Sequence, residues 1–258
     1  MNTAFRERLT RGLGLSRSLW LYWRPGRQRG LRRLYATFLA PGDVAFDIGA
    51  HLGDRSGAFA GLGAQVVALE PQPHLYAWLQ RLVGWRQGVI LLPYAAGAEP
   101  GHAELAVSRA TPTVSTLATH WRQYIGERNE GFRHVTWDER IRVRLITLDE
   151  LIARYGSPAF CKIDVEGFEA EVLAGLSQPL PALSVEFVSG SLEVSQACVD
   201  RLAALGEYRY NTIEGESRQF RWTQWRTPDE VREWLEAGAD GLASGDLYAR
   251  LAAPSPSA

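Results

Sequence analysis

The chain has 258 residues, a net charge of −1 and a hydrophobic content of 46%. This length and apolar content suit one α/β domain with additions, and the near-neutral charge argues against a nucleic-acid-binding protein. The two cysteines, Cys161 and Cys198, are too few for a disulfide framework, and arginines interrupt the apolar stretches near the N-terminus, so we expect a cytoplasmic protein without a signal peptide or a transmembrane segment.

Residues 1–40 form a basic arm in which the only acid is Glu7. The arm also carries an aromatic cluster at residues 19–23, and it allows two interpretations. One is a pair of helices, or a single helix, that packs on the domain and exposes an arginine face. The other is a lid over an anionic or amphiphilic substrate, or a weak contact with a membrane surface. The arginines are Arg6, Arg8, Arg11, Arg17, Arg24, Arg27, Arg29, Arg32 and Arg33.

Residues 44–53, Val-Ala-Phe-Asp-Ile-Gly-Ala-His-Leu-Gly, predict a buried strand, a glycine turn and the start of a helix. The apolar run is typical of a parallel strand that is covered on both faces. Gly49 and Gly53 lack a Cβ atom, which lets a ligand lie against the main chain. A second apolar run, 65–69, ends in Glu70. In doubly wound nucleotide folds an acid at this place accepts hydrogen bonds from ribose hydroxyls.

Strand-like and helix-like segments continue to alternate along the chain, which predicts a parallel sheet with antiparallel strands at its C-terminal end. Thr147 is a predicted helix N-cap because Glu150 follows it at the capping-box position, and Thr227 opens a later helix. We predict strands at 65–69, 89–92, 102–108, 140–146, 159–165, 183–188, 208–213, 219–223 and 246–251, helices at 54–61, 74–83, 167–176 and 191–205, and a loop at 93–101.

Residues 109–140 interrupt this alternation. They have no clear period and are rich in charged and aromatic residues and in histidine, including His120 and His134. Long insertions of this kind often cover active sites. We therefore predict that residues 109–140 cap the active site.

The segment 161–167, Cys-Lys-Ile-Asp-Val-Glu-Gly, is unusual for a core strand. Lys162, Asp164 and Glu166 recur at every second residue, which predicts that they share one face. Buried charges are costly unless they are paired, so Lys162 is a candidate partner for one of the acids, either in a structural ion pair or in a functional site. Ligands of open α/β sheets bind outside the carboxyl ends of the strands. These acids and those that end the first two strands are therefore expected to share one crevice.

These segments resemble the FkbM-type methyltransferases, which are S-adenosylmethionine-dependent enzymes with the seven-stranded class I fold. The resemblance rests on residues 47–53, 70–71, 147–150 and, most specifically, 162–175. It implies an α/β, Rossmann-like, mostly parallel sheet of about seven strands, with antiparallel strands at the C-terminal end and helices on both faces. It divides the chain into the arm at 1–40 and a methyltransferase domain at 41–253. His51 departs from the family, which usually has Asn at this position.

The resemblance also implies a role for each matching residue. Glu70 would hold the ribose hydroxyls of S-adenosylmethionine, Asp164 would lie near the sulfonium and Glu166 near the acceptor. The other positions that it assigns to the cofactor are Asp47, Gly49 and Gly53 at the methionine part, Ala50, His51 and Pro71 beside them, and Ala95 and Ala96 at the adenine.

Members of this family commonly methylate hydroxyl groups, so the expected reaction is O-methylation of a sugar, glycan, lipid or secondary metabolite. Asp164 or Glu166 is the expected base for the hydroxyl proton. His51, His120 and His134 are rival bases because histidine titrates near neutral pH. The two carboxylates could instead hold a divalent cation that acidifies a diol, although the sequence contains no metal motif with ligand spacing.

Three other functions are weighed against this one. A nicotinamide dehydrogenase would carry G-x-G-x-x-G after the first strand, and the chain does not. A nucleic-acid methyltransferase would carry an Asn/Asp-Pro-Pro-aromatic motif after the fourth strand and a basic surface beyond the arm. This chain lacks the motif, and its net basic charge is confined to the arm. A non-catalytic nucleotide-fold module that binds a partner through the basic arm is the alternative that we retain. The expected partner is a small-molecule or carbohydrate acceptor.

Overall fold

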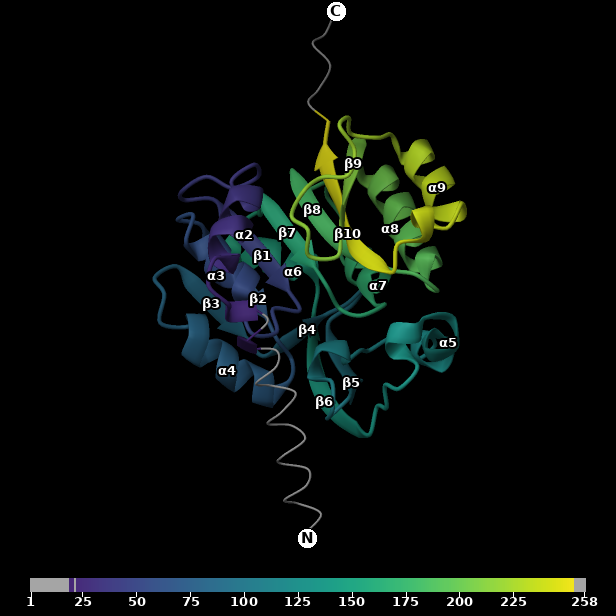
Figure 1. The fold of residues 1–258 in the computed structure, drawn as a ribbon. Helices are drawn as coiled ribbons and strands as arrows, with labels where there is room; N and C mark the ends of the chain where they lie inside the picture. The colour runs from purple at the N-terminus through teal and green to yellow at the C-terminus, as the bar shows by residue number, and fades with distance from the viewer. Residues whose placement is uncertain (1–18, 21, 253–258) are drawn as a thin grey trace, which may run out of the picture.

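The computed structural model describes residues 19, 20 and 22–252 (Figure 1). At its centre lies a seven-stranded sheet in the order β3-β2-β1-β7-β8-β10-β9. Neighbouring strands from β3 to β8 are parallel, whereas β10 runs antiparallel to both β8 and β9, so the predicted sheet is confirmed. The strands are β1 (Val44–Ile48), β2 (Gln65–Leu69), β3 (Val89–Leu92), β7 (Phe160–Ile163), β8 (Ala182–Val188), β9 (Tyr208–Glu214) and β10 (Ser244–Leu251).

The inner strands bury side chains on both faces because helices cover both sides of the sheet. In β1, Phe46 and Ile48 belong to one hydrophobic core and Ala45 belongs to the other. The predicted helical layers on both faces are therefore confirmed. The first core is covered by α6 (Leu148–Tyr155), α7 (Glu169–Ala174), α8 (Leu192–Leu205) and α9 (Pro228–Glu236), and the second by α2 (Arg27–Tyr35), α3 (Asp54–Ala60) and α4 (Pro73–Val83).

Two of these helices begin at capping boxes. The Thr147 hydroxyl accepts a hydrogen bond from the Glu150 amide, and the Glu150 carboxylate accepts one from the Thr147 amide at 3.1 Å. Thr227 and Glu230 form the same pair of bonds at the start of α9. Each box satisfies amides that the first helical turn leaves without partners, which fixes where the helix begins. The predicted helix starts at Thr147 and Thr227 are confirmed.

A second, three-stranded sheet in the order β4-β6-β5 lies beside the first. Its strands are β4 (Tyr94–Ala96), β5 (Gly101–Val107) and β6 (Glu139–Ile146). The prediction of a loop over 93–101 is wrong at β4, because these residues pair in parallel with β6, some fifty positions later in the chain. Between β5 and β6 lie η1 (Pro112–Val114), α5 (Trp121–Arg128) and η2 (Glu130–Phe132).

Two predicted strands also need correction. The strand predicted at 159–165 ends at Ile163, because Glu166 and Gly167 take positive φ angles of 55° and 85° and turn the chain towards α7. Residues 219–223 are irregular rather than extended. Their apolar alternation reflects Phe220 and Trp222, which pack against the two cores from irregular backbone.

The described part of the arm packs on the domain. Helix α2 lies against α3, with Leu31 and Tyr35 buried in the core between the helices and the sheet. Arg24, Arg29, Arg32 and Arg33 are exposed, but Arg27 is buried. The other predicted arm arginines, Arg6, Arg8, Arg11 and Arg17, lie outside the described residues. No helix within 19–20 and 22–252 is both long enough and apolar enough to cross a membrane.

Candidate active site

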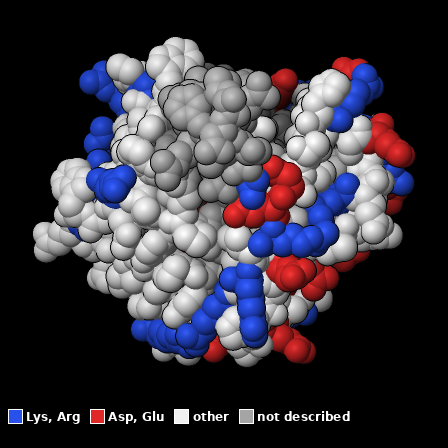
Figure 2. Space-filling model, turned by 90° about the horizontal axis from the view of Figure 1, so that it is seen from below, with Lys and Arg blue, Asp and Glu red and all other residues white. Residues whose placement is uncertain are grey.

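A cavity opens at the carboxyl ends of β1, β2, β7 and β8, the edge at which open α/β sheets bind ligands. Figure 2 shows the molecule from below, where Asp and Glu side chains gather near the centre of the face and Lys and Arg border them. The cavity brings together nearly all of the predicted site residues. Those that line it are Asp47, Gly49, Ala50, His51, Glu70, Pro71, Ala95, Ala96, Asp164 and Glu166.

Gly49 and Gly53 are both in the left-handed region, with φ of 81° and 76°, but for different reasons. A Cβ atom on Gly49 would lie 2.0 Å from the carbonyl oxygen of Asp164. Glycine therefore lets the loop after β1 approach the end of β7. Gly53 is not among the lining residues, and a Cβ atom there would meet Leu79 Cδ1 at 2.5 Å. It supports the loop from behind, through packing on α4.

The acids that end β1 and β2 are held by fixed hydrogen bonds. Ser56 in α3 donates its hydroxyl to Asp47 at 2.5 Å. Glu70 accepts the backbone amides of His51 at 3.0 Å and Gln72 at 2.8 Å. Burial raises the pKa of Glu70 to about 7 in spite of these two bonds. A carboxylate offers more than two acceptor positions, so Glu70 can still receive hydrogen bonds from a ligand diol.

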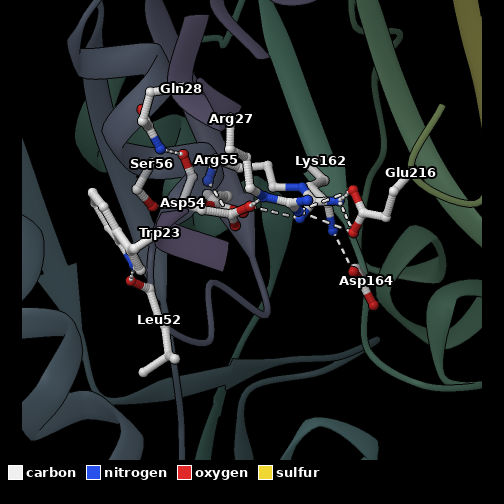
Figure 3. A network of polar contacts seen from close by, with 11 residues as sticks. Trp23, Arg27, Gln28, Leu52, Asp54, Arg55, Ser56, Lys162, Asp164 and Glu216 are labelled. Carbon is white, nitrogen blue, oxygen red and sulfur yellow. Dashed lines mark hydrogen bonds and ion pairs between the residues drawn. The ribbon is translucent and has the colours of Figure 1, made fainter. Parts of the chain in front are cut away.

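The end of β7 carries the only lysine of the chain, Lys162, whose side chain is 2% exposed. Its ammonium donates to Asp164 Oδ2 at 2.5 Å (Figure 3), which confirms that Lys162 pairs with an acid of this segment. Burial by itself would raise the pKa of Asp164, but the charge of Lys162 overrides it and holds the pKa below its usual range. Asp164 is therefore a stable anion at the centre of the cavity.

Three carboxyl groups meet beside this pair. Oxygens of Asp164, Glu166 and Glu186 all lie within 4.8 Å of one another. Burial, and then the charge of Asp164, raise the pKa values of Glu166 and Glu186 well above their usual range. Asp246 on β10 also lines the cavity, and burial raises its pKa to about 6. One ionised carboxylate and several carboxyls that hold their protons more tightly thus share one chamber, an arrangement suited to proton transfer.

The family follows from a comparison of sequences. The profile described as "Methyltransferase FkbM domain" matches residues 47–240, which is more than half of the chain. The chain belongs to the FkbM methyltransferase family. Its central sheet, with β10 inserted in reverse between β8 and β9, is the class I methyltransferase fold. Both the family and the fold predicted from the sequence are therefore confirmed.

Solved structures that match this FkbM methyltransferase share little sequence with it. The precorrin-6y C5,15-methyltransferase of Geobacter metallireducens is 12% identical, with 88% of this chain and 87% of that chain covered and a TM-score of 0.46. An S-adenosylmethionine-dependent O-methyltransferase of Thermotoga maritima is 10% identical, with 90% and 67% covered and a TM-score of 0.44. Fibrillarin of Aeropyrum pernix with natively bound S-adenosylmethionine is 11% identical, with 81% and 67% covered and a TM-score of 0.41. No curated protein matches the chain significantly.

Several residues that line the cavity of this FkbM methyltransferase were not predicted as site residues, among them Glu186, Asp246, Tyr22, Arg55 and Glu216. Glu186 is the one acid in the apolar run 183–188, and that signal could have identified it. Asp246 lies in a predicted strand, but nothing nearby marks it. Tyr22, Arg55 and Glu216 come from the arm, from α3 and from the loop after β9, and only the tertiary structure brings them to the cavity.

The predicted cap contributes to the cavity through its first part. Thr113, Ser115 and Leu117 are lining residues, and the Ser115 hydroxyl donates to Gln72 Oε1 at 3.1 Å. Further along, the indole of Trp121 packs on the turn that carries Glu166. A Cβ atom on Gly167, in the same turn, would lie only 2.6 Å from this indole. The insertion thus reaches the cavity wall and supports the acidic turn.

Among the three candidate histidine bases, only His51 lines the cavity. Burial lowers the pKa of His51 to about 4, so its imidazole is neutral at neutral pH and a weak base. Its Nε2 atom is buried and has no hydrogen-bond partner among the described residues. His120 and His134 are not lining residues. Of the predicted candidate bases, Asp164, Glu166 and His51 therefore line the cavity.

The carboxylates of Asp164, Glu166 and Glu186 are the described groups that lie close enough to share a metal ion. Hard divalent cations prefer such oxygen ligands. However, Lys162 already places a positive charge against Asp164 Oδ2. An ammonium therefore balances the ionised member of the cluster.

Proposed function

We propose that the chain is an S-adenosylmethionine-dependent methyltransferase that methylates a hydroxyl group of a sugar, glycan, lipid or secondary metabolite. The observation that carries this proposal is the single cavity that unites Glu70, at the end of β2, with Asp164 and Glu166, after β7. In a fold of this class Glu70 would accept hydrogen bonds from a ribose diol. Asp164 and Glu166 would then face the sulfonium and the acceptor hydroxyl. The acceptor would be a small molecule or a carbohydrate rather than a nucleic acid.

Residues at the β1–β2 end of the cavity would hold most of the cofactor. Glu70 would bind the ribose hydroxyls, while Ala95 and Ala96 border the space for the adenine. Asp47, Gly49, Ala50, His51 and Pro71 would surround the methionine part, with Gly53 behind their loop. When bound, S-adenosylmethionine supplies an electrophilic methyl group on a positively charged sulfur. Asp164, which Lys162 keeps ionised, would stabilise that charge.

Glu166 is the proposed base. The pKa of Asp164 is lowered, so its carboxylate accepts a proton poorly, whereas the pKa of Glu166 is raised and its carboxylate accepts one readily. The acceptor oxygen would form a bond to the methyl carbon as the carbon–sulfur bond breaks, and the hydroxyl proton would pass to Glu166. Positioning of the two reactants is worth roughly 7–11 kcal/mol in such displacements.

Calorimetry with S-adenosylhomocysteine, together with methyl transfer from S-adenosylmethionine that is radiolabelled in its methyl group, tests the proposal. We expect the product cofactor to bind, and label to enter small molecules or glycans. Absence of S-adenosylhomocysteine binding would contradict the proposal. Binding without transfer to any glycan, lipid or metabolite extract would instead favour a non-catalytic module that uses the same fold.

A further inference from the structure

The arm is attached to the loop that follows β1. The indole of Trp23 donates to the Leu52 carbonyl at 3.2 Å, and the side-chain amide of Gln28 donates to the Asp54 carbonyl at 2.8 Å (Figure 3). These bonds join residues of the arm to the segment that joins β1 to α3. The arm therefore holds the predicted cofactor loop directly and is more than a cover for the outer face of α3.

A buried arginine extends this attachment to a third segment. The side chain of Arg27 is 0% exposed, and its Nε donates to Asp54 at 2.7 Å, while its other end forms an ion pair with Glu216 at 2.9 Å. Arg55 contacts the same two acids, Asp54 at 2.9 Å and Glu216 at 3.3 Å. Two cations and two anions from α2, from α3 and from the loop after β9 thus form one network. Buried charges need such partners, so moving one segment disturbs the others.

Three members of this network, Asp54, Arg55 and Glu216, line the cavity. Tyr22, which lies beside the network, is a lining residue too. The ring of Tyr22 meets that of His51 edge-on, with 5.3 Å between the centroids, and the Arg27 guanidinium lies 5.0 Å from the centre of the Tyr22 ring. The Glu216 side chain is 39% exposed, so its carboxylate is still accessible to a ligand.

Glu216 lines the cavity beside the start of β10, because the amide of its neighbour Gly215 donates to the carbonyl of Ser244 at 3.1 Å. In the sheet order, β10 lies on the opposite side of β7 from β1 and β2. Most residues proposed to hold the cofactor come from β1, from β2 and from the loops after them, while Ala95 and Ala96 come from β4 and Asp164 follows β7. Although burial would raise the pKa of Glu216, Arg55 and Arg27 together lower it, so the group remains a carboxylate.

We propose that Arg27 is a positioning residue that links the cofactor loop to Glu216, and that Glu216 forms a hydrogen-bond-accepting wall of the acceptor site. This inference rests on the proposed function. Carboxylates accept hydrogen bonds from hydroxyl and ammonium groups and repel anions. The described cations at this wall, Arg27 and Arg55, are already paired with Asp54 and Glu216. The acceptor therefore carries hydroxyl or amino groups near its reacting oxygen and no phosphate or carboxylate there.

Amide hydrogen exchange with S-adenosylhomocysteine as the probe tests the positioning role without a known acceptor. In the unaltered protein we expect the ligand to slow exchange in residues 50–56 and also in residues 212–218. In Arg27→Met we expect the ligand to bind and to slow exchange only in residues 50–56. Arg29→Met is the matched control, because Arg29 is an exposed arginine of the same helix, and it should behave as the unaltered protein. Equal slowing in residues 212–218 of Arg27→Met, or none in the unaltered protein, would overturn the link.

Methyl transfer to a small-molecule extract tests the acceptor wall. Glu216→Gln should raise the half-saturating concentration of extract about tenfold or more, as expected for a lost hydrogen bond to a charged group, with little change in S-adenosylhomocysteine affinity. Arg27→Met should also raise the half-saturating concentration. In the double variant this concentration should be only slightly higher than in Glu216→Gln alone. Mass-spectrometric fragmentation of the labelled products should find no phosphate or carboxylate next to the methylated oxygen. Such a group at that position, or an unchanged half-saturating concentration, would overturn this assignment, whereas absence of any S-adenosylhomocysteine binding would mean that the proposed function itself has failed.

Discussion

The carboxyl groups at the two ends of the cavity have different partners. At the β1–β2 end, Glu70 is fixed by two backbone amides and Asp47 by the hydroxyl of Ser56. At the β7–β8 end, Asp164, Glu166 and Glu186 face one another, and a single lysine balances one of them. The first arrangement holds acceptor atoms still, which suits the binding of a diol. The second stores mutual repulsion in a small space, which suits proton transfer.

The sharpest test of this contrast is Glu166→Gln. If Glu166 is the base, kcat should fall by about 10²–10⁴-fold, while S-adenosylhomocysteine affinity should change little. In the unaltered enzyme kcat should rise with pH as Glu166 ionises, at a pH above that of an ordinary carboxyl group, because the pKa of Glu166 is raised. Steady-state kinetics across pH measures both effects. Glu171→Gln, at an exposed position of α7, is the control, and an equal loss there would remove Glu166 from the mechanism.

Lys162→Met should show how strongly the acidic end depends on its one ammonium. Removing one member of a buried ion pair costs about 3–5 kcal/mol, and Asp164 would then face the other carboxyls without a cation. We expect the free energy of unfolding to fall by an amount of this order, as measured by denaturant titration. The double variant Asp164→Asn/Lys162→Met should recover part of the lost free energy of unfolding. If Lys162→Met alone is as stable as the unaltered protein, protonation of the carboxyl groups already relieves the repulsion at this end.

Glu70→Ala addresses the opposite end. We expect S-adenosylhomocysteine affinity to fall by about tenfold or more, because hydrogen bonds to a charged acceptor are lost, with the fold intact. Calorimetry gives the affinity and circular dichroism gives the fold. Glu70→Gln keeps the size of the side chain, so its affinity for S-adenosylhomocysteine should lie between those of the unaltered protein and Glu70→Ala. Unchanged affinity in Glu70→Ala would exclude Glu70 from the ribose site.

The smallest expected effect is on the pH dependence of the free energy of unfolding of the ligand-free protein. The pKa of Glu70 in the folded state, about 7, is above its unfolded value, so the folded state retains the proton longer. The stability that this group contributes is fully present below about pH 4.5 and is lost as the pH rises through 7, by an amount on the order of 1–3 kcal/mol. Glu70→Gln should flatten this slope in denaturant titrations between these pH values. An unchanged slope would mean that burial does not perturb Glu70.

Local patterns in the sequence predicted most of the framework. The alternation of strands and helices, the capping boxes at Thr147 and Thr227, and the acids that end the strands depend on short-range periodicity and hydrogen bonding. Because parallel strands place their carboxyl ends at one edge, those patterns also predicted that Asp47, Glu70 and Asp164 share a crevice. The sequence by itself determined the fold, the family and the edge of the sheet at which the site lies.

Only the tertiary structure decided which other groups complete the site. The turn at Glu166, the position of Glu186 beside it and the meeting of Arg27 with Glu216 join residues that are up to 189 positions apart. No local period encodes such meetings, because they depend on the strand order of the sheet and on the way the loops fold back over its edge. The chemistry of the cavity, unlike its place in the fold, is therefore a property of long-range packing.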